Sequence, residues 1–415
     1  MKIVIIGNGP AAISAAETVR GLDGACEIVM ISKETVPFYS PCPLAEYVEA
    51  SVPRDRLFLR DENFYREQRI DTLFGCAAVG IDTAARQVKL SNGVAVAYDR
   101  LLIANGANAF KPPIPGLADT PGVFSLKTLD DAEGILARLP QARRAVVIGS
   151  GFIGLEAAQG LVRRGLQVTV LEALGQVLPQ MLDTEMAALV EQRLREHGVE
   201  VLTNCKAEAI LGGASGITAV RAGGQDIPCD LLVCAAGVRP DLSFLSGSGI
   251  ATAAGILVDA HMQTNVPDVY AAGDVVEALD TQGQHRVLAN WPNATNGGRI
   301  AALNMMGVKR RSRGMDSINV VRIFDIPVSS FGTNKGERTL RYQEEGVLRK
   351  LTLNDSHVVG AQMYGDVNRT GMLYEVMVKG LDVRSMEGEL LGPNFGYGQL
   401  LLSPSVARQT MAAVV

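Results

Sequence analysis

Two glycine-rich turns, each between a short apolar run and a helix-like segment, constrain the fold of this chain more than any other feature. The second turn lies in RAVVIGSGFIGLEAAQ, which starts at residue 144 and contains Gly149-x-Gly151-x-x-Gly154. In such a turn the first glycine allows a tight bend, the second lets a pyrophosphate approach the backbone, and the third lets the helix pack on the strand. The helix N-terminus then favours the phosphate charge. The segment therefore predicts a dinucleotide-binding β-α-β unit.

The same unit continues into a second predicted strand over residues 167–171, which ends at Glu172. A carboxylate at this place accepts hydrogen bonds from the ribose hydroxyls of NAD and would repel the 2′-phosphate of NADP. No arginine follows in LEALGQ to accommodate that phosphate. The unit therefore favours NAD over NADP.

The N-terminal segment KIVIIGNGPAAISAAETVRGL repeats this pattern with Gly7-x-Gly9-x-x-Ala12. Its second predicted strand, EIVMIS, ends at Ser32, where an acidic residue is usual, and Lys33 and Glu34 follow. Either Ser32 or Glu34 could reach a ribose, and the sequence does not decide between them. Two such units in one chain predict two bound dinucleotides.

Three further apolar runs end in small-residue turns. TNVPDVYAAGDV ends at Gly273-Asp274, YDRLLIANGAN reaches Ala104-Asn105-Gly106, and LLVCAAGVRPD reaches Gly237. A strand that ends in Gly-Asp can present its carboxylate and the next backbone N–H to a ribityl chain.

The order of these motifs resembles the pyridine nucleotide–disulfide oxidoreductase family over essentially the whole chain. The resemblance implies an α/β fold with two Rossmann-like domains and an α+β C-terminal interface domain. It implies an FAD domain over 1–110 and 240–314, an NAD domain over 111–239, and the interface domain over 315–415, through which the chain could form a homo-oligomer.

The resemblance also implies roles for single residues. Phe152 matches an aromatic gate over the flavin, and Glu156 matches a glutamate near the nicotinamide. The implied FAD contacts are Gly7, Gly9, Pro10, Ala11, Ala12, Ser32, Lys33, Pro41, Cys42, Val79, Ala104, Asn105, Gly106, Gly273, Asp274 and Trp291. The implied NAD contacts are Gly149, Gly151, Phe152, Ile153, Gly154, Glu172 and Gly237.

Cys42, in PFYSPCPLAEYV, is the candidate redox thiol. The chain lacks the CxxxxC pair of the family's dithiol members, which excludes their chemistry. Cys42 stands where single-cysteine NADH oxidases and coenzyme A–disulfide reductases carry their thiol, but Pro10 replaces the histidine of the oxidases. The pattern YSPCPL equally resembles the flavin-pocket segment of rubredoxin and ferredoxin reductases, except that Glu46 stands where these carry a lysine. We favour pocket lining for Cys42 over redox chemistry.

The composition limits the partners and the cellular compartment that we expect for this protein. The net charge of −5 argues against nucleic acid as a partner, because phosphate binding needs a basic surface. The six cysteines and four histidines are scattered, which indicates a reducing compartment and no metal site. No apolar run approaches the roughly 18 residues that a membrane span needs. We expect a cytoplasmic protein.

We predict an FAD-dependent NAD(H):acceptor oxidoreductase whose partner is an iron–sulfur protein, such as a rubredoxin or ferredoxin, or an iron–sulfur subunit of a larger redox complex. The alternative enzyme is a single-cysteine NADH oxidase or coenzyme A–disulfide reductase that uses Cys42. The alternative outside enzymology is an assembly subunit that holds FAD without turnover. The densest basic run, GVKRRSRG over 307–314, is either a docking site for an acidic partner or a solvated linker.

Overall fold

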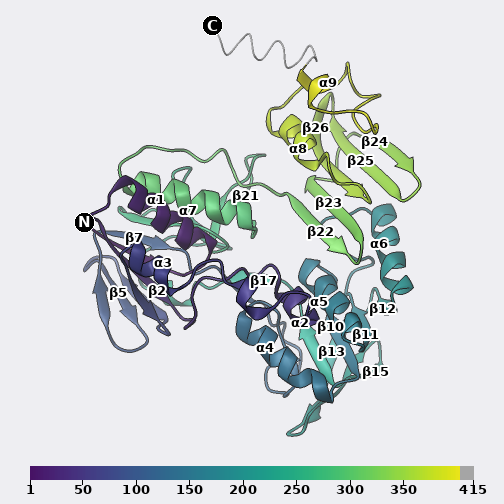
Figure 1. The fold of residues 1–415 in the computed structure, drawn as a ribbon, viewed down its shortest axis with the longest axis horizontal. Helices are drawn as coiled ribbons and strands as arrows, with labels where there is room; N and C mark the ends of the chain where they lie inside the picture. Colours follow the sequence, from purple (N-terminus) through teal and green to yellow (C-terminus); the bar gives the residue numbers. More distant parts are fainter. Residues whose placement is uncertain (402–415) are drawn as a thin grey trace. The chain divides into compact units, whose positions relative to one another are not determined.

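The computed structural model describes residues 1–401 and divides into two compact units (Figure 1). Unit 1 comprises residues 1–44, 52–110 and 238–316, and unit 2 comprises 45–51, 111–237 and the chain from 317 onward. The last part of the predicted interface domain, residues 402–415, lies outside the described residues. Both units contain a parallel sheet with helices, so the predicted α/β class is confirmed.

Unit 1 is built on a five-stranded parallel sheet in the order β19-β7-β1-β2-β3. Apolar β-branched runs form its centre, which is typical of strands that are covered on both faces. The five strands are β1 (Lys2–Ile6), β2 (Glu27–Ser32), β3 (Ile70–Phe74), β7 (Arg100–Ile103) and β19 (Val269–Ala271). The smaller strands of this unit are β4 (Ala78–Asp82), β5 (Gln87–Leu90), β6 (Ala95–Ala97), β8 (Ala107–Ala109), β17 (Val238–Pro240), β18 (Ile256–Leu257), β20 (Val276–Leu279) and β21 (His285–Arg286).

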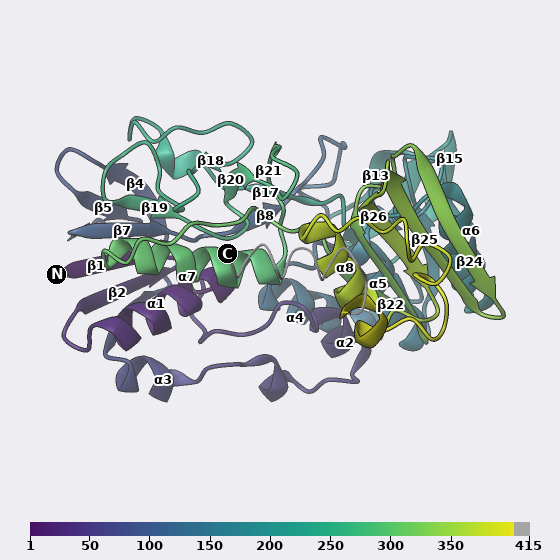
Figure 2. The ribbon, with the colours of Figure 1, turned by 90° about the horizontal axis from the view of Figure 1, so that it is seen from above.

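Two helices of unit 1, α1 (Pro10–Leu22) and α7 (Trp291–Met305), lie side by side (Figures 1 and 2). They approach closely because their contact is made of small residues. A Cβ on Gly298 would lie 2.1 Å from the carbonyl oxygen of Ala11. This contact brings segments far apart in the sequence to one place. The short helix α3 (Glu62–Glu67) precedes β3.

Unit 2 contains a second five-stranded parallel sheet, in the order β12-β11-β10-β16-β9. Its strands are β9 (Val123–Phe124), β10 (Arg144–Ile148), β11 (Gln167–Leu171), β12 (Val199–Leu202) and β16 (Leu231–Cys234). An antiparallel sheet adds β13 (Ala207–Gly213), β14 (Gly216–Ala222) and β15 (Gln225–Pro228). The helices of this half are α4 (Leu129–Arg138), α5 (Phe152–Arg163) and α6 (Thr184–Glu196), and most of α2 (Leu44–Glu49) also belongs to unit 2.

The C-terminal part of unit 2 is an antiparallel sheet in the order β22-β23-β26-β25-β24, with helix α8 (Thr370–Val378) packed against it and α9 (Tyr397–Leu401) after it. Its strands are β22 (Asn319–Ile323), β23 (Ile326–Gly332), β24 (Arg338–Glu344), β25 (Val347–Asn354) and β26 (His357–Tyr364). The buried ammonium of Lys350 lies 2.6 Å from Asp183 and 2.5 Å from Glu185, at the start of α6. This ion-pair cluster joins the C-terminal sheet to the dinucleotide-type half of the unit.

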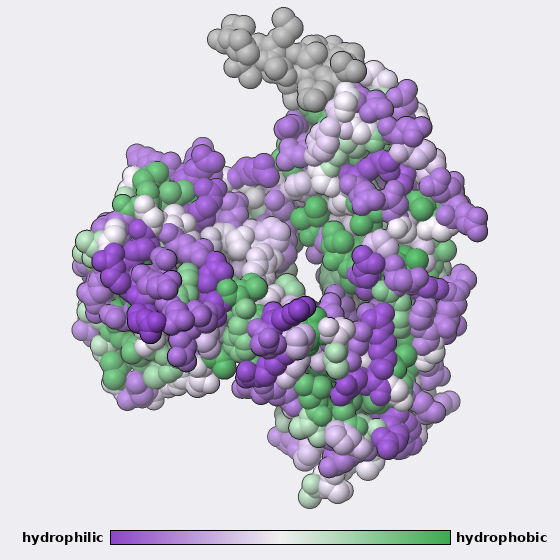
Figure 3. Space-filling view, viewed as in Figure 1, coloured by the Kyte–Doolittle hydropathy of each residue, from purple (hydrophilic) through white to green (hydrophobic). Residues whose placement is uncertain are grey.

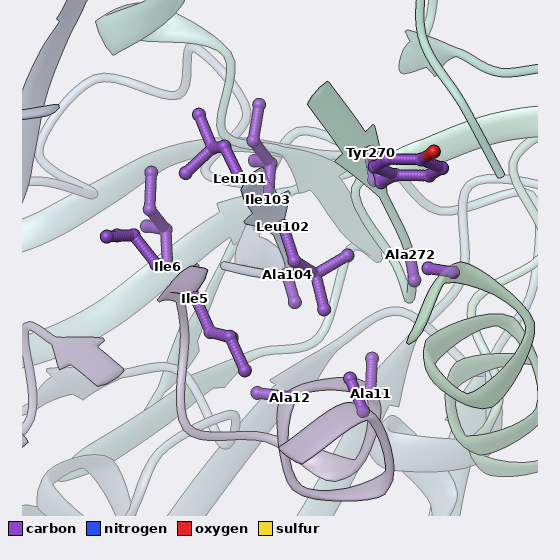
Figure 4. Close-up of a cluster of buried hydrophobic side chains, with 14 of the residues drawn as sticks. Ile5, Ile6, Ala11, Ala12, Leu101, Leu102, Ile103, Ala104, Tyr270 and Ala272 are labelled. Carbon is purple, nitrogen blue, oxygen red and sulfur yellow. The ribbon is translucent and has the colours of Figure 1, made fainter. Parts of the chain in front are cut away.

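A large apolar core of unit 1 lies between its sheet and helices α1 and α7 (Figure 4). Ile5, Leu102 and Ala12 are fully buried there. On the face drawn in Figure 3, hydrophilic side chains cover most of the surface and apolar ones form smaller groups. None of the helices in residues 1–401 has the length and apolar character needed to cross a bilayer.

Leu102→Ala should lower the free energy of unfolding of unit 1 by about 3 kcal/mol, because it leaves a cavity at a fully buried position. Urea unfolding of the apoprotein measures this. Leu59→Ala is the matched control, because Leu59 is in the same unit with 44% of its surface exposed, and it should change stability by under about 0.5 kcal/mol. Equal losses in the two variants would contradict the assignment of the core.

Candidate active site

The first glycine turn joins β1 to α1 and has room for a phosphate. Gly7 has φ +123°, and a Cβ on it would lie 2.1 Å from the carbonyl oxygen of Ala104 at the end of β7. Only glycine fits such an approach. A Cβ on Gly9, by contrast, would have no neighbouring atom within 4 Å among the described residues, so the space beside Gly9 is open. Helix α1 starts at Pro10 without a side-chain cap, so its first N–H groups remain available for an anion.

Two other loops of unit 1 reach this turn. A Cβ on Gly273 would lie 3.2 Å from Ala11 and 3.8 Å from Ala294 of α7, so the Gly273-Asp274 turn lies beside the start of α1. Asn105, after β7, donates from Nδ2 to the Asp241 carbonyl at 3.1 Å. Its Oδ1 is buried with no hydrogen-bond partner among the described residues. A buried orphan acceptor beside an open phosphate-type turn fits a bound ligand that donates a hydrogen bond.

The end of β2 holds the candidates for ribose contact. Ser32 is buried, and its Oγ accepts from the Glu34 N–H at 3.1 Å. The Glu34 carboxylate accepts from the Tyr39 hydroxyl at 2.8 Å. The exposed Lys33 donates to Asn108 at 2.8 Å. All of these are in unit 1, as are the other predicted FAD residues. Ala12 and Gly106 lie at the turns described above, Pro41 is half-buried before Cys42, and Val79 is 54% exposed on β4.

The Cys42 segment is attached to the first glycine turn through a residue that the sequence patterns did not indicate. The buried Tyr65 hydroxyl donates to Asn8 Oδ1 at 2.8 Å and accepts from the Phe38 N–H at 2.9 Å. Phe38 in turn packs on Trp291, with ring centroids 5.8 Å apart. Cys42 itself is exposed, and its N–H donates to Ser40 Oγ at 3.3 Å. Nothing in the spacing of α3 marks Tyr65 as part of this site.

The second glycine turn joins β10 to α5 and has the same geometry. Gly149 has φ +99°, and a Cβ on it would lie 2.5 Å from the carbonyl oxygen of Ala235, just after β16. Gly151 faces open space, while a Cβ on Gly154 would lie 2.0 Å from the Gly149 carbonyl oxygen. Helix α5 also starts without a side-chain cap. This turn therefore fits a second pyrophosphate.

Glu172 lies at the end of β11 with 8% of its surface exposed. Its Oε2 accepts from the N–H and hydroxyl of Ser150 at 2.9 and 2.6 Å, and its Oε1 accepts from the Leu174 N–H at 2.9 Å. These bonds fix the carboxylate against the glycine turn, and Oε1, which accepts only one of them, keeps further acceptor capacity. A dinucleotide ribose there could donate to it.

The remaining predicted NAD residues are in the same unit. Phe152 is the half-buried first residue of α5, Ile153 beside it is 42% exposed, and Gly237 follows β16 with φ +99°. Glu156 lies four residues after Phe152 on α5, so both are on one face of the helix.

Glu156 and Glu46 line one pocket of about 240 Å³ within unit 2. Burial, followed by the nearby Glu46 carboxylate, raises the pKa of Glu156 to about 7. Glu46 Oε2 is buried with no hydrogen-bond partner among the described residues. Two cations, Arg163 and Arg322, also line the pocket; Arg163 is 2.7 Å from Glu49, and among the described residues neither forms an ion pair with Glu46 or Glu156. Glu46 and Glu156 therefore form a pair of carboxyl groups in one pocket, and Glu156 holds a proton into the neutral range.

Two glycine turns, each on its own parallel sheet and each open at its second glycine, define the class: a protein with two dinucleotide-binding sites. The family model of the pyridine nucleotide-disulphide oxidoreductases matches residues 1–298. This is more than half of the chain, so the chain belongs to that family. The predictions of an oxidoreductase that uses FAD and NAD(H), and of a two-dinucleotide fold, are confirmed.

Named relatives cover most of this chain. It is 33% identical to an NADH oxidase of Methanocaldococcus jannaschii, over 80% of this chain and 76% of the relative. It is 29% identical to the epsilon subunit of an NADH-dependent phenylglyoxylate dehydrogenase of Aromatoleum evansii, over 97% of both chains, and to an NADH-rubredoxin oxidoreductase of Clostridium acetobutylicum, over 88% and 92%. Among solved structures, an NAD-dependent persulfide reductase of A. fulgidus matches with a TM-score of 0.88 and 30% identity, covering 100% of this chain and 83% of the other.

The raised pKa of Glu156 predicts a pH-dependent stability. The folded protein keeps the Glu156 proton at pH values where the unfolded chain has lost it, so the free energy of unfolding falls as the pH rises from about 4.5 to about 7. The loss is about 3 kcal/mol when complete. Glu156→Gln should remove this loss, which urea unfolding at about pH 5 and about pH 8 measures.

Two further variants separate the causes. Glu46→Gln removes the neighbouring charge and so lowers the pKa of Glu156 in the folded protein, which should make the loss of stability smaller and complete at a lower pH value than in the wild type. Glu345→Gln, at an exposed position of the same unit, should leave the pH profile unchanged. An identical profile in wild type and Glu156→Gln would show that folding does not raise the pKa of Glu156.

Proposed function

We propose that this protein is an FAD-dependent oxidoreductase that transfers electrons between NAD(H) and an iron–sulfur protein or subunit. The observation that carries the proposal is the duplicated site: each unit has a glycine turn that is open at its second glycine and leads into a helix without a side-chain cap. The relatives support the partner class, since one is named for rubredoxin and another is a subunit of a larger NADH-dependent enzyme.

Unit 1 holds FAD in this proposal. The N–H groups at the start of α1 bind the pyrophosphate, and Gly9 leaves room for it. The buried Oδ1 of Asn105 accepts a hydrogen bond from the cofactor, and Asp274 accepts from its ribityl chain. Ser32 and Glu34 remain the two candidates for the ribose, since the Ser32 hydroxyl and the Glu34 carboxylate each accept one hydrogen bond and each can bind further.

Unit 2 holds NAD(H). The start of α5 binds its pyrophosphate, and Glu172 accepts from its ribose hydroxyls and disfavours a 2′-phosphate. When bound, the two cofactors supply the chemistry, which is hydride transfer on the NAD side and single-electron exchange on the acceptor side. Phe152 is proposed to orient the nicotinamide, and Glu156 to hold or release a proton beside it. We also retain the three-domain division, a cytoplasmic location and assembly through the C-terminal sheet as proposals.

Anaerobic addition of NADH should bleach the flavin absorbance of the purified holoprotein. Gly151→Val is the sharp comparison: its side chain enters space that is open in the folded protein, so it should leave the fold and FAD intact but block the NAD pyrophosphate. The variant should need at least about tenfold more NADH for the same bleaching, while dithionite bleaches both proteins equally. A wild-type flavin that responds to dithionite and not to NADH would instead support an FAD-holding assembly subunit.

A second candidate function is thiol-dependent turnover at Cys42, as in a single-cysteine NADH oxidase or coenzyme A–disulfide reductase. One observation favours it: Cys42 is exposed, and the segment that carries it is fixed to the first glycine turn through Tyr65. Neighbouring prolines and the absence of a second cysteine nearby favour pocket lining instead.

Cys42→Ser decides between these two functions. We expect NADH-driven reduction of a one-electron dye to change less than about twofold, because the electrons leave without a thiol. Reduction of a low-molecular-weight disulfide is measured in parallel, and Cys76→Ser provides a half-buried control cysteine in unit 1. If both activities of Cys42→Ser collapse while FAD stays bound, Cys42 is the redox group.

A further inference from the structure

One segment of unit 1 concentrates positive charge at the surface. We call residues 307–314, GVKRRSRG, the basic loop. Lys309, Arg310, Arg311 and Arg313 are all exposed, and no acidic residue occurs between Arg299 and Asp316. Within the described part of the chain, no ion pair includes any of these four cations. They are therefore available to an external negative charge, although the chain as a whole has a net charge of −5.

The backbone of the basic loop is fixed from both sides. Asn304, near the end of α7, accepts from the Arg310 N–H at 3.1 Å and donates to the Arg310 carbonyl at 2.7 Å. His261 Nδ1 lies 2.9 Å from the same carbonyl oxygen, and the Ser312 N–H donates to the Ala260 carbonyl at 2.7 Å. A loop held in this way loses little conformational freedom on binding a partner. A merely solvated linker would not need these four contacts.

The basic loop also lies beside the elements that hold FAD in our proposal. Ser312 and Gly314 line a small pocket together with Gly273 and with Asn296 of α7. The Met315 N–H continues the contact by donating to Leu279 of β20 at 2.8 Å. The rate of electron transfer falls steeply with distance. A carrier bound at the basic loop would lie close to the Gly273-Asp274 turn, and therefore close to the FAD that we propose there, while it stays on the surface.

We propose that the basic loop is the docking surface for the acidic face of a small iron–sulfur protein that exchanges electrons with this enzyme. The proposal rests on the proposed function and adds the place and charge of the partner contact. Exposed cations without an enclosing pocket fit a protein surface better than a free anion, which needs convergent donors. Charge complementarity of this kind steers encounter and sets its salt dependence.

The test uses the holoprotein and the double variant Arg310→Glu/Arg311→Glu. The matched control is Arg56→Glu/Lys89→Glu, which makes the same charge change at exposed positions of unit 1. With the NADH-reduced enzyme, three rates are measured at low and at high salt: the reduction of an acidic rubredoxin, of an acidic [2Fe–2S] ferredoxin, and of a neutral quinone. Equilibrium binding of the oxidised rubredoxin and ferredoxin is measured separately by calorimetry.

We expect the loop variant to lose at least about tenfold in the rate of its iron–sulfur partner at low salt, to lose the salt dependence, and to bind that partner correspondingly more weakly. The quinone rate should stay unchanged, and the control should behave like the wild type. If loop variant and control react equally with a carrier that the wild type reduces, the docking surface is wrong and the proposed function stands.

Other outcomes overturn the proposal differently. A wild type that reduces the quinone but neither acidic carrier rejects the partner class, and with it both the docking surface and the proposed acceptor. A loop variant that changes its sedimentation from oligomer to monomer, with unchanged carrier rates, makes the basic loop a contact between copies of this chain. An NADH-reduced flavin that fails with all three acceptors rejects the proposed function itself.

Discussion

The contact on which both cofactor sites depend is the close approach of a glycine to the carbonyl oxygen that ends a neighbouring parallel strand. In unit 1 this is Gly7 against Ala104, and in unit 2 it is Gly149 against Ala235. In each case any Cβ would lie less than 3 Å from that oxygen, so the turn exists only with glycine there. The approach places the next glycine and the first N–H groups of the helix at the carboxyl edge of the sheet, where a pyrophosphate can bind.

This duplicated constraint explains why much of the fold could be predicted from the sequence. The turns, their flanking strands and the acidic end of β11 follow local rules, because strand, glycine spacing and helix are all read within about thirty residues. Small residues such as Gly298 let α7 approach α1. The sequence shows Gly298 and Ala11, but it does not show that these two residues meet.

The rest depends on contacts between distant segments. Tyr65 connects Asn8 to Phe38 through one hydroxyl, and no spacing rule could select this tyrosine. The orphan Oδ1 of Asn105 likewise becomes visible only once the surrounding carbonyl and amide groups are placed. Residues 45–51 belong to the compact unit of α5 and not to that of Cys42, only a few residues earlier. Domain boundaries predicted from sequence motifs do not show that residues 45–51 leave the unit that precedes and follows them.

Because residues 45–51 belong to unit 2, Glu46 lies in the same pocket as Glu156 of α5. A lysine at position 46 would favour the anionic form of Glu156, because an adjacent cation lowers a carboxyl pKa. In this chain burial, followed by the Glu46 carboxylate, raises the pKa of Glu156 to about 7. Of the two arginines in the pocket wall, Arg163 pairs with Glu49, and among the described residues Arg322 forms no ion pair with either glutamate of the pair. With a lysine at position 46, an ion pair would keep Glu156 ionised. With Glu46 there, the Glu156 carboxyl can gain or lose its proton near neutral pH. The charge of Glu156 on α5 can therefore change near neutral pH, whereas a salt bridge at this place would keep the carboxylate ionised.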